Sequence, residues 1–128
     1  MAVDMSVNIL IVDDYKTMVM IIRNLLKQLG FNRVDEALDG ETALAKLRAS
    51  DFGLVISDWN MEPMSGLDLL KEIRGDPQLT ETPFIMVTAE AKSSYVMAAK
   101  EAGVNNYIVK PFNAATLKSK IQAVLGTF

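Results

Sequence analysis

Short apolar runs alternate with amphipathic helical segments five times along this chain, and this alternation limits the fold more than any other feature. The run at 53–58 is almost entirely apolar, as expected for a strand covered on both faces of a sheet. Because a helical segment follows each run, the chain is predicted to form an open parallel sheet with right-handed crossovers and helices on both faces, an α/β fold. The expected strands lie near residues 8–12, 33–37, 53–58, 84–87 and 107–109.

The helical segments end at residues that favour helix termini. Gly30 and Gly103 follow the first and fourth segments, as glycine does at the C′ position of many helices. Pro77 breaks the third helix, and Asn113 is placed to cap the last one. The strand at 33–37 carries acids among few apolar residues, so we expect it at an edge of the sheet.

Composition excludes several classes of function. The chain has 128 residues, half of them hydrophobic, so we expect one domain over 1–128 with no attached output domain. The net charge of −3 gives no reason to expect a nucleic acid or a membrane as partner. The absence of cysteine and histidine excludes disulfides, thiolate or imidazole metal ligands, and histidine acid–base catalysis. Met1–Ser6 lacks the features of a signal peptide and no apolar stretch could cross a bilayer, so we expect a cytoplasmic protein.

Polar and charged residues follow four of the predicted strands. Asp13 and Asp14 follow the first strand, Asp58 ends the third, and Thr88 and Lys110 follow the last two. The carboxyl ends of parallel strands meet at one edge of a sheet, where ligands of such folds bind. Three carboxylates against one ammonium repel one another unless a cation joins them, and Mg²⁺ prefers oxygen ligands. The sequence therefore predicts a Mg²⁺ site at this edge.

Each of these residues also has an ordinary structural interpretation. Asp13 or Asp14 could cap the next helix, and Asp58 could form a turn. The combination favours chemistry, because a carboxylate beside a metal can attack phosphorus and form an aspartyl phosphate. A metal and Lys110 would stabilise charge on the phosphoryl oxygens, and the Thr88 hydroxyl could donate a hydrogen bond to them.

Four motifs carry a family resemblance: Val12-Asp13-Asp14, Ser57-Asp58-Trp59-Asn60-Met61, Thr88-Ala89-Glu90-Ala91-Lys92 and Val109-Lys110-Pro111-Phe112. Together they closely resemble the receiver domain of response regulators, and within that family the chemotaxis regulators of the CheY type. The resemblance extends over nearly the whole chain. It implies a flavodoxin-like (βα)5 three-layer sandwich with a five-stranded parallel sheet in the order 2-1-3-4-5.

The resemblance also implies roles for the acids. Asp58 is expected to be the phosphoacceptor. Asp14, Asp58 and the backbone carbonyl of Asn60 are expected to hold Mg²⁺, with Asp13 bound partly through water. Asn60 and Glu90 occupy positions that tune water access and dephosphorylation in this family.

Further roles fall on the last two strands. The resemblance implies that Thr88 and Tyr107 form a switch pair, in which the hydroxyl moves to the phosphoryl group and the ring turns inward. Lys110 is expected to contact the phosphoryl group, and the Lys110–Pro111 peptide bond is expected to be cis.

Three positions depart from the family pattern. Glu62 stands where the family usually has proline, and Pro63 follows it, so the loop can differ in shape and carries extra negative charge. Residues 18–20 and 95–97 add apolar side chains beyond the expected core stripes. They are either scattered surface residues or, for 18–20, an altered docking face for a kinase, a phosphotransfer domain or a phosphatase. The sequence does not decide which of the side chains at 96 and 97 is buried.

We therefore expect a response regulator of a two-component system that is a phosphorylation-controlled switch and not an enzyme. It would accept a phosphoryl group from a chemotaxis-type histidine kinase. It would then bind a target, first of all the flagellar motor switch, through the face formed by the fourth helix, fifth strand and fifth helix. A phosphatase is a further possible partner, and we expect a monomer.

Three alternatives would change the function, and the first of them keeps the same domain. A phosphate sink or a relay adaptor in cell-cycle or developmental signalling would use the same residues. A phosphatase with an Asp nucleophile would need a second Asp two residues on, where this chain has Asn60 and Tyr15. A flavodoxin-like electron carrier would need a phosphate-binding loop where Asp13 and Asp14 stand.

Overall fold

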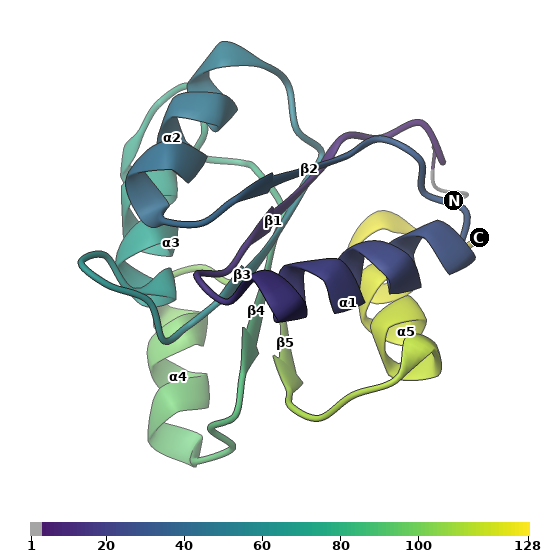
Figure 1. The fold of residues 1–128 in the computed structure, drawn as a ribbon. Helices are drawn as coiled ribbons and strands as arrows, with labels where there is room; N and C mark the ends of the chain where they lie inside the picture. Colours follow the sequence, from purple (N-terminus) through teal and green to yellow (C-terminus); the bar gives the residue numbers. More distant parts are fainter. Residues whose placement is uncertain (1–3) are drawn as a thin grey trace.

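The computed structural model describes residues 4–128. Met1–Val3 lie outside the described residues, so the expectations for the first residues of the domain and for the absence of a signal peptide at Met1–Ser6 are not followed there. Five strands alternate with five helices (Figure 1). They are β1 (Ile9–Val12), α1 (Lys16–Gln28), β2 (Val34–Ala37), α2 (Gly40–Ala49), β3 (Leu54–Asp58), α3 (Gly66–Gly75), β4 (Phe84–Thr88), α4 (Ser93–Glu101), β5 (Asn106–Val109) and α5 (Ala114–Leu125).

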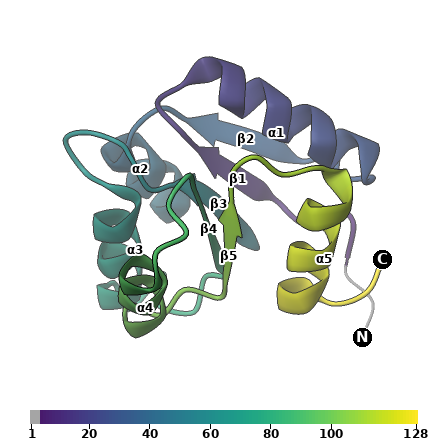
Figure 2. The same cartoon turned by 90° about the horizontal axis from the view of Figure 1, so that it is seen from below.

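The strands form one parallel sheet in the order β2-β1-β3-β4-β5, which confirms the expected fold. Helices α1 and α5 cover one face, and α2, α3 and α4 cover the other (Figure 2). The weak strand β2 lies at an edge, as its acids predicted. Because all the strands run parallel, the carboxyl ends of β1, β3, β4 and β5 lie on the same side of this three-layer molecule.

The alternation of side chains along each strand builds two cores. In β1, Ile9 and Ile11 pack toward α1 and α5, whereas Leu10 and Val12 pack toward α2 and α3. All four are fully buried. Burying such a side chain contributes about 1.5–3 kcal/mol. The two cores fix the strand ends, and hence the site, in place.

The helix ends follow the sequence signals in most cases. Gly30 and Gly103 have positive φ angles of 103° and 93°, which glycine adopts without strain. Asn113 caps α5 by accepting a hydrogen bond from the Thr116 N–H at 2.9 Å. Asp39 caps α2 in the same way by accepting a hydrogen bond from the Thr42 N–H, and this cap was not among the sequence predictions.

The additional apolar residues of α1 and α4 divide between core and surface. Val19 is buried, whereas Met20 is 63% exposed. In α4, Val96 is partly buried and Met97 is 58% exposed, which decides the pair that the sequence left open. None of the helices in the described part of the chain has the length and apolar character needed to cross a membrane.

Candidate functional site

Three carboxylates meet at the carboxyl edge of the sheet. Asp13 and Asp14 follow β1, and Asp58 is the last residue of β3. One carboxylate oxygen from each lies within 4.8 Å of the others. Asp13 and Asp58 are 1% and 7% exposed, whereas Asp14 is exposed. The structure thus brings together the three acids that the sequence placed at strand ends.

Lys110 is the cation of this cluster. Its Nζ donates a hydrogen bond to Asp58 Oδ1 at 3.1 Å and lies 3.9 Å from Asp13 Oδ2. Among residues 4–128 no other ion pair involves these carboxylates. One ammonium therefore faces three carboxylates, which leaves excess negative charge in a partly buried site.

Asp13 shows the effect of this excess most clearly. Burial raises the pKa of Asp13 to about 6; the hydrogen bond from the Tyr15 N–H opposes this rise, and the charge of Asp58 adds to it. Asp13 Oδ2 is buried and has no hydrogen-bond partner among the described residues. Asp13 does not cap α1, whose first turn has no side-chain cap. An ionised buried oxygen without a donor is costly, and a bound cation would remove that cost.

The donor set fits a hard divalent cation. Carboxylate oxygens converge, one of them lacks a partner, and the local charge is negative. Mg²⁺ takes oxygen ligands and retains several waters, so it needs few protein groups and room for solvent. A cavity of about 380 Å³ lined by Asp14, Trp59, Asn60, Met61, Glu62 and Ser65 provides this room beside the acids.

The loop between β3 and α3 closes tightly against the strand end. The Trp59 carbonyl accepts hydrogen bonds from Met61 N at 3.1 Å and Gly66 N at 2.8 Å. A Cβ atom at Gly66 would overlap the backbone carbonyl of Asp58. Glycine at the start of α3 therefore lets the helix begin directly behind Asp58. No role was assigned to Gly66 from the sequence, because the close approach to Asp58 depends on how α3 packs.

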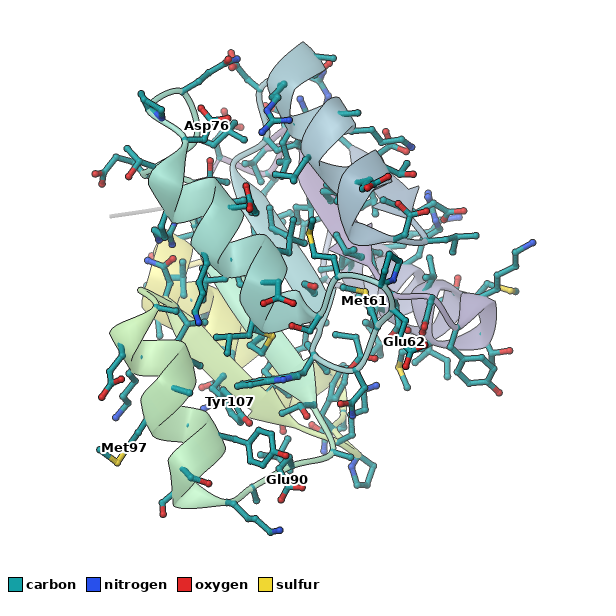
Figure 3. All side chains as sticks on the ribbon, turned by 90° about the vertical axis from the view of Figure 1, so that its left-hand side faces the viewer. Met61, Glu62, Asp76, Glu90, Met97 and Tyr107 are labelled. Atoms are coloured by element: carbon teal, nitrogen blue, oxygen red, sulfur yellow. The ribbon has the colours of Figure 1, made fainter. Side chains whose placement is uncertain are left out.

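A second group of residues lies at the ends of β4 and β5. Thr88 is 1% exposed, and its Oγ1 accepts a hydrogen bond from the Glu90 N–H at 3.1 Å. The Tyr107 hydroxyl donates to the Glu90 carbonyl at 2.7 Å. The ring of Tyr107 lies edge-on to Trp59, which in turn lies edge-on to Tyr95. Both members of the expected switch pair thus contact the backbone of Glu90. Figure 3 shows Glu90 and Tyr107 beside α4.

Two peptide bonds in the site loops are cis. Lys110–Pro111 has the cis bond that the family resemblance implied, and Glu62–Pro63 has a second one that was not expected.

The pKa of the Tyr107 hydroxyl is raised, mainly by burial and further by the charge of Glu90.

Comparisons with known proteins find a matching family model and similar relatives. The model of the response regulator receiver domain matches residues 9–122. The chain is 55% identical to chemotaxis protein CheY-3 of Vibrio cholerae over 119 residues, which is 93% of this chain and 92% of that protein. It is 52% identical to chemotaxis protein CheY of Pseudomonas aeruginosa over 116 residues, 91% of this chain and 94% of that protein.

Solved structures give the same result for the fold. The chemotaxis response regulator CheY4 of Vibrio cholerae has a TM-score of 0.87 and 35% identity, covering 94% of this chain and 99% of that chain. The receiver domain of the sensor histidine kinase PA1611 from Pseudomonas aeruginosa has a TM-score of 0.85 and 27% identity, covering 95% and 99%. That receiver domain holds a magnesium ion coordinated in its active-site cleft.

Proposed function

This chain belongs to the response regulator receiver family, and from that premise we propose that Asp58 is the residue that accepts the phosphoryl group. As a CheY-like protein it is a signalling switch of a two-component system, and its relatives support a role in chemotaxis. The observation that carries the proposal is the position of Asp58. Its carboxylate is buried at the end of β3, beside two further acids and 3.1 Å from Lys110.

The proposed reaction moves a phosphoryl group from a phosphohistidine of a histidine kinase to Asp58. An Asp58 carboxylate oxygen attacks phosphorus, an O–P bond forms, the P–N bond breaks, and the donor imidazole leaves with the electron pair. Asp14, Asp58 and the Asn60 carbonyl would hold Mg²⁺, with Asp13 partly through water. When bound, the metal would neutralise charge on the phosphoryl oxygens. Lys110 would contact the same oxygens.

The switch is proposed to pass through Thr88 and Tyr107. The phosphoryl group adds roughly −1.5 to −2 charges and three strong acceptors, which would draw the Thr88 hydroxyl toward Asp58. Because Thr88 and Tyr107 both hydrogen-bond the backbone of Glu90, a shift of Thr88 would be felt by the ring of Tyr107. The ring would then turn inward, which would change the surface formed by α4, β5 and α5.

The partners are proposed from the chemotaxis relatives. A chemotaxis-type histidine kinase would be the donor, and the flagellar motor switch would bind the α4-β5-α5 surface. A phosphatase is a further partner, and Asn60 and Glu90 would tune how fast the phosphoryl group is lost. The domain is proposed to act in the cytoplasm as a monomer.

Labelling tests the phosphoacceptor. Acetyl phosphate with Mg²⁺ is expected to add one phosphoryl group to the wild-type protein, seen by intact-protein mass spectrometry. Asp58→Asn should reduce this labelling by more than about 100-fold, because the amide is a poor nucleophile. Asp51→Asn, which removes an exposed acid in the loop before β3, serves as the control and should label normally. Full labelling of Asp58→Asn at the wild-type rate would exclude the assignment.

Capture of partners tests the output. The wild-type protein with beryllofluoride, a phosphoryl mimic, should retain a motor switch protein from a cell extract, and the untreated protein should not. Recovery of a phosphotransfer domain alone would favour a phosphate sink or relay adaptor.

Lys110→Ala should leave metal binding largely intact but separate phosphorylation from target binding. Unchanged target affinity of the phosphorylated variant would reject that role of Lys110.

A further inference from the structure

Glu62 is a fourth carboxylate beside the metal site. It is exposed on the loop between β3 and α3, at the position where the sequence departs from the family pattern. Its side chain lines the same cavity of about 380 Å³ as Asp14, Asn60 and Ser65. Within residues 4–128, no hydrogen bond or ion pair involves the Glu62 carboxylate at the distances that define such contacts. Its charge is therefore available to a cation in this cavity.

The backbone on both sides of Glu62 is anchored. Met61 is 5% exposed and belongs to the core under α2 and α3, and Met64 packs against the same core. The hydrogen bonds from Met61 N and Gly66 N to the Trp59 carbonyl close the loop. Figure 3 shows Met61 and Glu62 together on this loop, away from Glu90 and Tyr107 beside α4. An anchored backbone keeps Glu62 at the lining of this cavity.

The charge balance gives Glu62 a direction of effect. Asp13, Asp14 and Asp58 already exceed the one ammonium of Lys110, so a further negative charge cannot be offset within the site. Mg²⁺ keeps several of its waters when proteins bind it, and these waters present hydrogens to nearby carboxylates. A carboxylate outside the ligand set can thus attract the ion by its charge and accept hydrogen bonds from its waters.

We propose that Glu62 strengthens the binding of the divalent cation from outside the ligand set, through its charge and through metal-bound water. This inference rests on the proposed Mg²⁺ site. It gives a functional reason why Glu62 stands where the family usually has proline: its carboxylate would increase the affinity of the site for the ion that phosphorylation requires. The effect is electrostatic, so it must follow the charge of the side chain and weaken in salt.

Mg²⁺ titration of a charge series tests the proposal. Trp59 borders the cavity, so its fluorescence can follow binding, and isothermal titration calorimetry gives an independent dissociation constant. At low salt Glu62→Gln should weaken Mg²⁺ binding about threefold to fivefold, because a unit charge outside the ligand set acts on the dication through water. Glu62→Asp should stay close to wild type, and Glu62→Lys should weaken binding further. In 1 M salt, where the Debye length is about 3 Å, the Glu62→Gln effect should fall below about twofold.

Glu81→Gln provides the matched control. Glu81 is an exposed glutamate just before β4, at the amino ends of the strands and therefore far from the metal site at their carboxyl ends. Its replacement changes the net charge equally. Equal weakening in Glu62→Gln and Glu81→Gln, or wild-type affinity in Glu62→Gln at low salt, would overturn the role of Glu62. A wild-type protein without saturable Mg²⁺ binding would instead remove the proposed metal site, and the inference would fall with it.

Discussion

Acidic and basic side chains meet at the carboxyl ends of the strands and again along the edge strand β2, and the two regions differ in how many cations pair with their acids. At the carboxyl edge, three carboxylates share one lysine, and the two buried acids are almost closed to solvent. Along β2, each of two exposed acids has its own cation: Arg23 pairs with Glu36 at 2.8 Å, and Lys46 pairs with Asp35 at 3.0 Å.

The cations along β2 also bind the strand itself. Arg23 Nη1 donates to the Val34 carbonyl at 3.2 Å, and Lys46 Nζ donates to the Glu36 carbonyl at 2.6 Å. The carbonyls of Arg33 and Ala37 bond to β1, so those of Val34 and Glu36 face away from the sheet. Unpaired edge carbonyls invite another strand, and charged side chains prevent this.

The acids respond to these surroundings in opposite directions. Burial raises the pKa of Asp13 to about 6. The pKa of Asp35 is lowered: partial burial opposes the change, but hydrogen bonds from Lys46 and from the Glu36 N–H outweigh it. Unbalanced buried charge in this molecule therefore indicates a ligand site, whereas balanced exposed charge covers the open edge of the sheet.

Removing the cation of the site should give the largest effect. Lys110→Ala leaves two buried carboxylates without their counter-charge, so the unfolding free energy of the metal-free protein should fall by about 3 kcal/mol. Mg²⁺ should restore most of this loss, because it supplies positive charge at the same place. Urea denaturation with Mg²⁺ and with a chelator measures both. Lys71→Ala, on the exposed face of α3, is the control, and an equal loss there would contradict the prediction.

Removing an unbalanced acid should act the other way. In the folded protein Asp13 ionises near pH 6, but in the unfolded chain near its ordinary value of 3.8. Between these values the folded state binds more protons, so the contribution of Asp13 to stability falls as the pH rises from about 4 to 6. Asp13→Asn should therefore stabilise the metal-free protein by about 2 kcal/mol at pH 8 and by almost nothing at pH 4.

Thermal or urea unfolding across this pH range checks the sign of the Asp13 effect. The same variant should bind Mg²⁺ at least about tenfold more weakly, because it loses a carboxylate. A variant that is equally destabilised at pH 4 and pH 8 would show that Asp13 acts by packing and not by its charge.

Opening the β2 edge should have a smaller effect on stability but a visible effect on association. Arg23→Met with Lys46→Met should cost about 1 kcal/mol, because exposed charged hydrogen bonds contribute little. The freed carbonyls of Val34 and Glu36 should promote concentration-dependent self-association, measured by sedimentation equilibrium. Asp35→Asn with Glu36→Gln keeps both cations over the edge and should remain monomeric.

The smallest effect is expected for a single ion pair at this edge. Glu36→Gln should lower the unfolding free energy by less than about 0.5 kcal/mol, and 1 M salt should remove the difference. A loss above about 1.5 kcal/mol that persists in salt would mean that the edge is not balanced as described. The buried pair of Lys110 and Asp58 should be much less sensitive to salt.

Local patterns were sufficient for the fold. Apolar periodicity, the helix-ending glycines Gly30 and Gly103, and the N-cap Asn113 predicted the elements, and parallel crossovers placed the carboxyl ends of the strands together. Strand ends were predicted within about one residue, but the cap at Asp39 was missed, because many acids precede helices without capping them.

The sequence by itself determined the order of strands and helices and the edge at which Asp13, Asp14, Asp58 and Lys110 would meet, because these depend on periodicity and on chain direction. Only the tertiary structure decided that one oxygen of Asp13 is buried without a partner and that Lys110 lies closer to Asp58. It also decided that the edge carbonyls of β2 are covered. These features depend on side-chain rotamers and on packing between segments far apart in the chain, which no local pattern encodes.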